Sequence, residues 1–125
     1  MLLPKPDKKY TISDKLYAGH LRRLKEHREK GNGFGFSLFN SESPHTNTIS
    51  ARYYKDGSEV LIQQKNANPR KLTPEEAGLL QGYPIKEKKF QIVVSDVQAY
   101  KQFGNSVSVP VIKTLAREII KQLLK

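Results

Sequence analysis

A broad apolar stripe over residues 111–124 constrains the fold more than any other feature of the sequence. Pro110 suits the first turn of a helix, and the residues after it repeat with the period of an amphipathic helix of about 15 residues. A helix face this wide needs a surface to cover it. That surface could be this chain's own sheet or a second polypeptide, and periodicity does not separate the two. The stripe consists of Val111, Ile112, Leu115, Ala116, Ile119, Ile120, Leu123 and Leu124.

The charge balance favours an anionic partner. The 125 residues contain 22 Lys and Arg against 12 Asp and Glu, which gives a net charge of +10. Such a basic domain is typical of proteins that bind nucleic acid, although a solvated lysine-rich surface has the same composition. The apolar runs are far shorter than the roughly 20 residues of a membrane-spanning helix, and the N-terminal residues lack the apolar stretch of a signal peptide. We therefore expect a cytoplasmic protein with no membrane partner.

The residues that usually carry metal or covalent chemistry are absent or badly spaced. With no cysteine, the chain can form no disulfide, thiolate zinc site or cysteine nucleophile. His20, His27 and His45 lack the spacing of metal ligands. The serines and carboxylates do not suggest a nucleophile beside its base. We predict no metal and no catalytic residue in this chain.

A helix is predicted over residues 14–29, after an extended lead-in over residues 1–12. Ser13 can cap this helix, and apolar residues recur at near-helical spacing as far as Gly31. The other face is a basic strip that could lie along phosphates or could be a solvated face partly neutralised by glutamates. The strip consists of Lys15, Arg22, Arg23, Lys25, Arg28 and Lys30.

Glycines alternate along the segment Gly31–Phe36. Their GxGxG spacing differs from that of phosphate-binding loops, which argues against a nucleotide site. The segment instead predicts a strand near residues 34–39. Its glycines would let the strand run close to another backbone, either in this protein or in a bound polymer.

Asp56-Gly57 predicts a tight type I′ hairpin, because two runs rich in β-branched and aromatic residues flank it. In that register Tyr53 pairs with Val60 and Ala51 pairs with Ile62. One face would belong to the core: Ile49, Ala51, Tyr53, Val60 and Ile62. The opposite face would either face solvent or offer donors to bases and phosphates: Thr48, Ser50, Arg52, Tyr54 and Glu59.

The second half of the chain predicts three further elements before the last helix. Thr73 and Glu76 form a capping box for a helix that Gly82 and Pro84 end. A strand is predicted over residues 89–94, and a short helical stretch is predicted from Ser95 through Tyr100. The expected fold is α+β: a small, twisted, mainly antiparallel sheet within residues 34–94, one helix before it and helices after it, with residues 63–70 as a loop.

Three segments of the second half closely resemble the ninth and tenth sequence motifs of DNA (cytosine-5) methyltransferases. They are Arg70–Ala77, Leu80–Pro84 and Gln98–Val107. Upstream, Gly31–Phe36 and Thr46–Ile62 are similar to the target-recognition region of the bacterial branch that modifies CC-containing, palindrome-like sites. The resemblance runs from about Tyr10 to the C-terminus.

The resemblance implies a cofactor site, a DNA surface and a supporting motif. Asn105, Ser106 and Val107 match the motif that completes the S-adenosylmethionine pocket. Arg70 and the helix over residues 73–84 match the motif that supports the recognition region. With two arginines from the basic strip, the residues that we expect to bind double-stranded DNA are Asn32, Gly33, Thr48, Ser50, Arg52, Tyr54, Lys55, Arg22 and Arg23.

Three features of the family are missing. Its members use a Pro-Cys thiolate that attacks C6 of a flipped cytosine, a glycine-rich cofactor loop and a Glu-Asn-Val segment. This chain has none of them, so it is expected to be inactive alone. The resemblance thus implies the recognition subunit or C-terminal piece of a split enzyme, with a larger Pro-Cys chain docked through Val111–Leu124.

The expected organisation follows from this assignment. Residues 1–12 are the lead-in, residues 13–94 the recognition domain, and residues 95–125 the final motif with its docking helix. Two alternatives remain: a catalytically inert DNA-binding module or truncated remnant, and a structural or assembly factor with a solvated basic surface.

Overall fold

Local sequence signals mark the starts of several helices in the computed structural model, which describes residues 2–33 and 35–125. Helix α1 (Asp14–Glu29) begins where the Ser13 hydroxyl accepts a hydrogen bond from the Leu16 amide, and it has the predicted bounds. Helix α3 (Pro74–Leu80) begins with the predicted capping box. Helix α5 (Val109–Leu123) has proline in its first turn, as predicted. These local signals placed the starts of α1, α3 and α5 correctly to within one residue.

The N-terminal lead-in differs in one detail from its prediction. A short 3-10 helix, η1 (Lys8–Tyr10), interrupts the expected extended stretch, because the Asp7 carboxylate accepts a hydrogen bond from the Lys9 amide. Met1 of this lead-in and Phe34 of the predicted strand lie outside the described residues.

Three two-residue strands form one mixed sheet in the order β1-β2-β3. Strand β1 (Leu38–Phe39) is parallel to β2 (Leu61–Ile62), and β2 is antiparallel to β3 (Arg70–Lys71). The α+β class is confirmed. The expected mainly antiparallel sheet is instead mixed, because residues 46–62, which we call the recognition segment, bring β2 beside β1 in the same direction. Strand β1 falls within the predicted range 34–39.

The predicted hairpin at Asp56-Gly57 is wrong. Helix α2 (Tyr53–Asp56) occupies the first of its two expected strands, and Gly57 ends that helix in the left-handed conformation at φ 65°. A type I′ turn needs positive φ at both central residues, and Asp56 lies in the helix. The core face was nevertheless mostly right: Ile49, Tyr53, Val60 and Ile62 are buried, and Ala51 is half-buried.

Two further predictions in the second half need correction. Residues 89–94 form no strand and pair with none of the three strands of the described sheet, and Val93 is 85% exposed. Helix α4 (Asp96–Asn105) starts at the predicted cap but runs five residues beyond the predicted end at Tyr100. Gly104 and Asn105 therefore belong to a helix and not to the expected interruption.

Two tyrosines tie the core together. The Tyr53 hydroxyl donates to the Val60 carbonyl over 2.5 Å and accepts from the Leu72 amide over 2.8 Å. The Tyr100 hydroxyl donates to the Leu72 carbonyl, and the two rings meet edge to face with centroids 5.2 Å apart. Burial raises the pKa of both phenols well above their ordinary value, so both remain proton donors at neutral pH. This network joins α2, α4 and the segment between β3 and α3.

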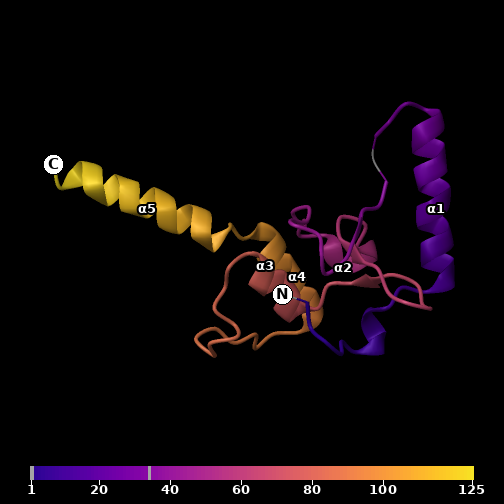
Figure 1. The fold of residues 1–125 in the computed structure, drawn as a ribbon, viewed down its shortest axis with the longest axis horizontal. Coiled ribbons are helices and arrows are strands. Elements are labelled where there is room, and N and C mark those ends of the chain that lie inside the picture. Colours follow the sequence, from indigo (N-terminus) through magenta and orange to yellow (C-terminus); the bar gives the residue numbers. More distant parts are fainter. Residues whose placement is uncertain (1, 34) are drawn as a thin grey trace.

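Helix α5 projects away from the other elements, at the opposite end of the molecule from α1 (Figure 1). Its apolar stripe is open to solvent: Val111 is 56% exposed and Leu123 is 79% exposed. This chain's own sheet therefore does not cover the stripe. None of the helices among the described residues has the length and apolar character needed to cross a membrane.

Candidate functional site

The residues expected to contact the cofactor lie where α4 ends and α5 begins. Asn105 and Val107 are exposed, and Ser106 is half-buried between them. The Ser106 amide donates to the Phe103 carbonyl over 3.1 Å and so closes the last turn of α4. We call Asn105–Val107 the cofactor turn, after the role that the sequence resemblance implies for it. It offers an exposed carboxamide, a hydroxyl and an apolar side chain, a donor set that fits the polar amino-acid end of S-adenosylmethionine.

Residues at the end of α3 frame this turn. The Gln81 side-chain amide donates to the Phe103 carbonyl, and the Gln81 carbonyl accepts from the Val109 amide, each over 2.8 Å. The hydroxyls of Tyr83 and Ser106 lie 2.5 Å apart. The sequence motif contains Gln81 and Tyr83, but no local pattern indicates that they reach residues more than twenty positions away.

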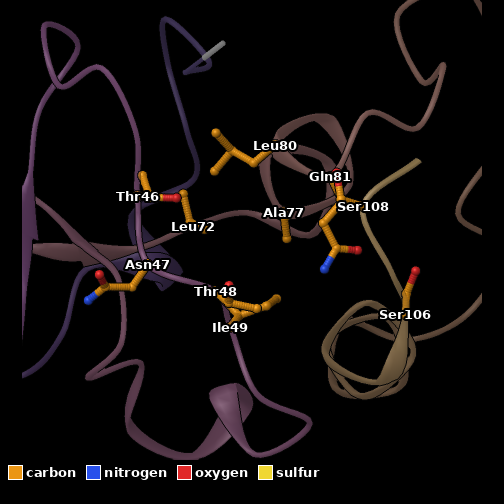
Figure 2. Close-up of a pocket in the computed structure, with 10 residues that line it drawn as sticks. All are labelled: Thr46, Asn47, Thr48, Ile49, Leu72, Ala77, Leu80, Gln81, Ser106 and Ser108. Carbon is orange, nitrogen blue, oxygen red and sulfur yellow. The ribbon is translucent and has the colours of Figure 1, made fainter. Parts of the chain in front are cut away.

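A cavity of about 290 Å³ lies between the cofactor turn and the segment that precedes α2. Figure 2 shows Thr48, from the segment before α2, and Ser106, from the cofactor turn, on different sides of this space. One residue expected to bind DNA and one expected to bind the cofactor thus line the same cavity. The lining residues are Thr46, Asn47, Thr48, Ile49, Leu72, Ala77, Leu80, Gln81, Ser106 and Ser108.

Gly104 brings the backbones of these two regions into direct contact. A β-carbon at Gly104 would lie 2.3 Å from the Ala51 nitrogen and from the Ser50 carbonyl carbon. Only glycine permits this approach, because the atoms opposite belong to the backbone. The recognition segment and the end of α4 are therefore packed as one unit.

The residues of the predicted DNA face do not share one strand face. The Ser50 hydroxyl donates to the Glu59 carboxylate over 2.5 Å. Arg52, which precedes α2, and Lys55, which lies within it, are exposed. Tyr54 is half-buried, and the Lys101 ammonium lies 5.3 Å from the centroid of its ring. The helix turns these side chains in different directions, and Arg52 before α2 and Lys55 within it are the exposed cations of this stretch.

The two arginines of α1 make different contacts. Arg22 is exposed and lies 3.8 Å from Glu26. Arg23 reaches across to α2: one guanidinium nitrogen lies 3.2 Å from the Asp56 carboxylate and 2.9 Å from Nδ1 of His20. Nε2 of the buried His20 lies 3.1 Å from the Asp56 carbonyl oxygen. Arg23 thus joins α1 to α2 and also remains half exposed.

Asn32 and Gly33 stand apart from the other residues expected to bind DNA. Both are exposed and follow the C-terminal end of α1, which lies away from α2 in Figure 1. The Asn32 amide donates to the His27 carbonyl over 2.8 Å, which holds this stretch to α1. Within the described residues, Thr48 thus lies near the cofactor turn and Arg23 contacts α2. Asn32 and Gly33 lie near neither.

Asp56 makes the contact between α1 and α2 dependent on pH. Burial alone would raise the pKa of its carboxyl, but hydrogen bonds from Ser58 and the Arg23 guanidinium outweigh burial and lower the pKa below 3.8. A depressed pKa in the folded state stabilises the fold above the ordinary pKa, and this contribution is lost as the pH falls through the folded-state value. We expect Asp56→Asn to lower the free energy of unfolding at pH 7, and urea unfolding should show this difference shrinking below about pH 4.

Glu42→Gln is the matched control, because the exposed Glu42 side chain makes no ion pair with any residue that the structure describes. Its effect on the free energy of unfolding should be small both at pH 7 and at pH 3. An Asp56→Asn difference that is equally large at pH 7 and pH 3 would contradict the role assigned to the carboxylate.

Known proteins resemble this chain over most of its length. Residues 2–121 match the family described as C-5 cytosine-specific DNA methylase. The chain is 64% identical over 114 residues to the type II methyltransferase M.NlaX of Neisseria lactamica, a match of 91% of this chain and 36% of that protein. It is 60% identical over 119 residues to M1.ScrFI of Lactococcus lactis subsp. cremoris, a match of 95% of this chain and 30% of that protein. The chain thus spans about a third of the length of these relatives.

Solved structures share the fold. The Dnmt2 methyltransferase of S. pombe superposes with a TM-score of 0.75 at 16% identity, over 99% of this chain and 41% of that one. The Entamoeba histolytica methyltransferase EhMeth superposes with a TM-score of 0.70 at 22% identity, over 98% of this chain and 39% of that one. Given the family match over nearly its whole length, the chain belongs to the C-5 cytosine-specific DNA methylase family.

Proposed function

We propose that this chain is the DNA-recognising part of a DNA (cytosine-5) methyltransferase and that it completes the S-adenosylmethionine pocket. The observation that carries the proposal is the close packing of Gly104 on Ser50 and Ala51. This contact fixes the recognition segment against the cofactor turn, an arrangement that suits an enzyme in which DNA and cofactor must be held in one geometry.

The chain supplies binding and positioning, and the nucleophile comes from elsewhere. It has no cysteine, so the thiolate that attacks C6 of the flipped cytosine must belong to another chain or to another region of a longer one. Bound S-adenosylmethionine would supply the methyl group for C5. Asn105, Ser106 and Val107 would hold its methionine end, because they combine an amide, a hydroxyl and an apolar contact at an accessible turn.

The DNA surface would combine cations with short polar side chains. Three cations are exposed and can neutralise phosphates, which makes binding salt-dependent: Arg52 just before α2, Lys55 on α2 and Arg22 on α1. Thr48 lies beside the cavity and is suited to contact a base edge or a phosphate. Three more side chains would contact DNA from different elements: Ser50 from the loop before α2, Tyr54 from α2 and Arg23 from α1. Asn32 and Gly33 would contact DNA from a separate loop.

The exposed face of α5 would receive the catalytic partner. The stripe over residues 111–124 is apolar, and it adjoins the cofactor turn because α5 begins at Val109. Docking there would bring the Cys-bearing chain or region beside the turn. The proposed organisation is a lead-in over residues 1–12, a recognition domain over residues 13–94, and the final motif over residues 95–125.

A chimaera tests the proposal with a defined partner. This chain replaces the matching 36% of M.NlaX, and transfer of tritiated methyl groups from S-adenosylmethionine to plasmid DNA is measured. We expect transfer by the chimaera and none by M.NlaX that lacks the segment. Sequencing after bisulfite treatment would identify the modified cytosines. A correctly folded chimaera that transfers no methyl group would count against the proposal.

A catalytically inert DNA-binding module is the second candidate, favoured by the absence of cysteine. Asn105→Ala separates the two, because Asn105 is exposed and its loss should leave the fold intact. In the chimaera we expect the cofactor Kd to rise about tenfold while DNA affinity stays unchanged. Unchanged cofactor affinity would favour the inert module.

A further inference from the structure

A tyrosine distant in sequence contacts the centre of the cofactor turn. The hydroxyl oxygens of Tyr83 and Ser106 lie 2.5 Å apart, at partly buried positions 23 residues from each other in the chain. The Ser106 hydroxyl also lies 3.3 Å from the Val107 carbonyl, to which it can donate. A serine hydroxyl has one proton. When that proton points to Val107, the Tyr83 hydroxyl is the donor and fixes the Ser106 rotamer.

The Tyr83 ring is itself held firmly. Its centroid lies 4.8 Å from that of Phe90 and 5.4 Å from that of Phe103. The Tyr83 amide donates to the Gly78 carbonyl over 3.0 Å, which anchors the residue to α3. Aromatic packing and a backbone hydrogen bond together leave the hydroxyl little freedom. A preorganised donor of this kind can impose a conformation on the residue that it contacts.

Gln81 holds the two ends of the same turn. Its side chain donates to the Phe103 carbonyl before the turn, and its carbonyl accepts from the Val109 amide after the turn. Gln81 and Tyr83 therefore bond to residues before, within and after the cofactor turn: Phe103, Ser106 and Val109. The turn's own exposed residues have few packing contacts that could order them, since Asn105 and Val107 face solvent.

We propose that Tyr83 is a positioning residue: its hydroxyl holds Ser106, and with it the cofactor turn, in the conformation that receives the amino-acid end of S-adenosylmethionine. The inference rests on the proposed function, since it assigns the turn to the cofactor. Gln81 supports the same conformation from both flanks. Tyr83 touches no reacting atom, and its effect passes through Ser106.

The first test uses the 125-residue chain alone. Tyr83→Phe removes only the hydroxyl and keeps the ring between Phe90 and Phe103. Amide hydrogen exchange at Ser106 and Val109, the two hydrogen-bonded amides here, should become about three- to tenfold faster, while exchange in α3 should stay unchanged. Tyr17→Phe is the matched control, because the Tyr17 hydroxyl makes no hydrogen bond within the described part of the chain. Unchanged exchange at the turn in Tyr83→Phe would overturn the inference.

The second test uses the M.NlaX chimaera. Tyr83→Phe should raise the KM for S-adenosylmethionine about three- to tenfold and leave kcat within about twofold, because only ground-state positioning is lost. In a Ser106→Ala background, Tyr83→Phe should change the KM less than twofold, because Ser106→Ala has already removed the hydrogen bond between the two hydroxyls. Equal effects of Tyr83→Phe with and without Ser106 would overturn action through Ser106.

The outcomes separate the inference from the proposed function. If the parent chimaera neither binds S-adenosylmethionine nor transfers methyl groups, the proposed function fails, whatever the exchange data show. If the parent chimaera is active and Tyr83→Phe loosens the turn without changing the KM, Tyr83 only stabilises the local fold, and the positioning role is wrong.

Discussion

Replacement of Arg70 by alanine is expected to destabilise the chain by about 3–5 kcal/mol. Arg70 and Glu76 form a bidentate ion pair with distances of 2.7 and 2.9 Å, and their side chains are only 4% and 0% exposed. The Glu76 carboxylate also accepts from the amides of Leu3 and Thr73. Without Arg70 the carboxylate would remain buried without its counterion, and desolvation makes that state costly. Urea unfolding at pH 7 measures the loss.

The matched control breaks an ion pair at the surface. Lys121→Ala removes a 2.6 Å contact with Glu118 outside the apolar stripe of α5, and it should cost about 0.5 kcal/mol or less. Arg70→Met combined with Glu76→Gln removes both charges and should recover part of the stability lost by Arg70→Ala. A loss below about 1 kcal/mol in Arg70→Ala would contradict the burial of the pair.

The elements that could be predicted from the sequence are those set by local interactions. The Ser13 cap and the Thr73–Glu76 capping box each act over three residues, so their geometry is encoded in a few adjacent positions. The bounds of α1 and the start of α3 follow from them. Arg70 on β3 and Glu76 on α3 are six residues apart in the chain. No local pattern indicates that both members of this ion pair are buried.

The hairpin prediction failed because one glycine fits two structures. Gly57 at φ 65° can end a helix or occupy a type I′ turn, and the flanking aromatic residues favour a strand by composition. In the structure Tyr53 lies on α2, and its hydroxyl bonds to Val60 and Leu72. Tertiary contacts thus override local β-propensity here.

The candidate site combines a motif visible in the sequence with contacts that the sequence hides. Resemblance indicated Asn105–Val107 and the recognition segment as separate regions. Their common cavity, the contact of Gly104 with Ser50, and the pairing of Tyr83 with Ser106 arise from chain folding over long sequence distances. Arg23 shows the same limit, because its contact with Asp56 depends on how α1 packs beside α2.

Replacement of Gly104 by alanine is expected to destabilise the chain by about 1–3 kcal/mol. The new β-carbon would meet three backbone atoms of Ser50 and Ala51 at 2.3–2.4 Å, and backbone atoms cannot rotate away as a side chain would. Helix α4 must therefore move away from the recognition segment. Alanine gains roughly 1 kcal/mol over glycine in helix propensity, so the measured loss is what remains after this offset. Urea unfolding measures the net change.

The same substitution at Gly19 is the matched control. Gly19 lies within α1, and a β-carbon there meets no atom within 4 Å. Gly19→Ala should therefore stabilise the chain by about 0.5–1 kcal/mol, the opposite sign to Gly104→Ala. Because α4 leads into the cofactor turn, Gly104→Ala should also weaken cofactor and DNA binding together in the M.NlaX chimaera. If Gly104→Ala stabilises the chain as Gly19→Ala does, the backbone contact that joins the recognition segment to the cofactor turn is absent in solution.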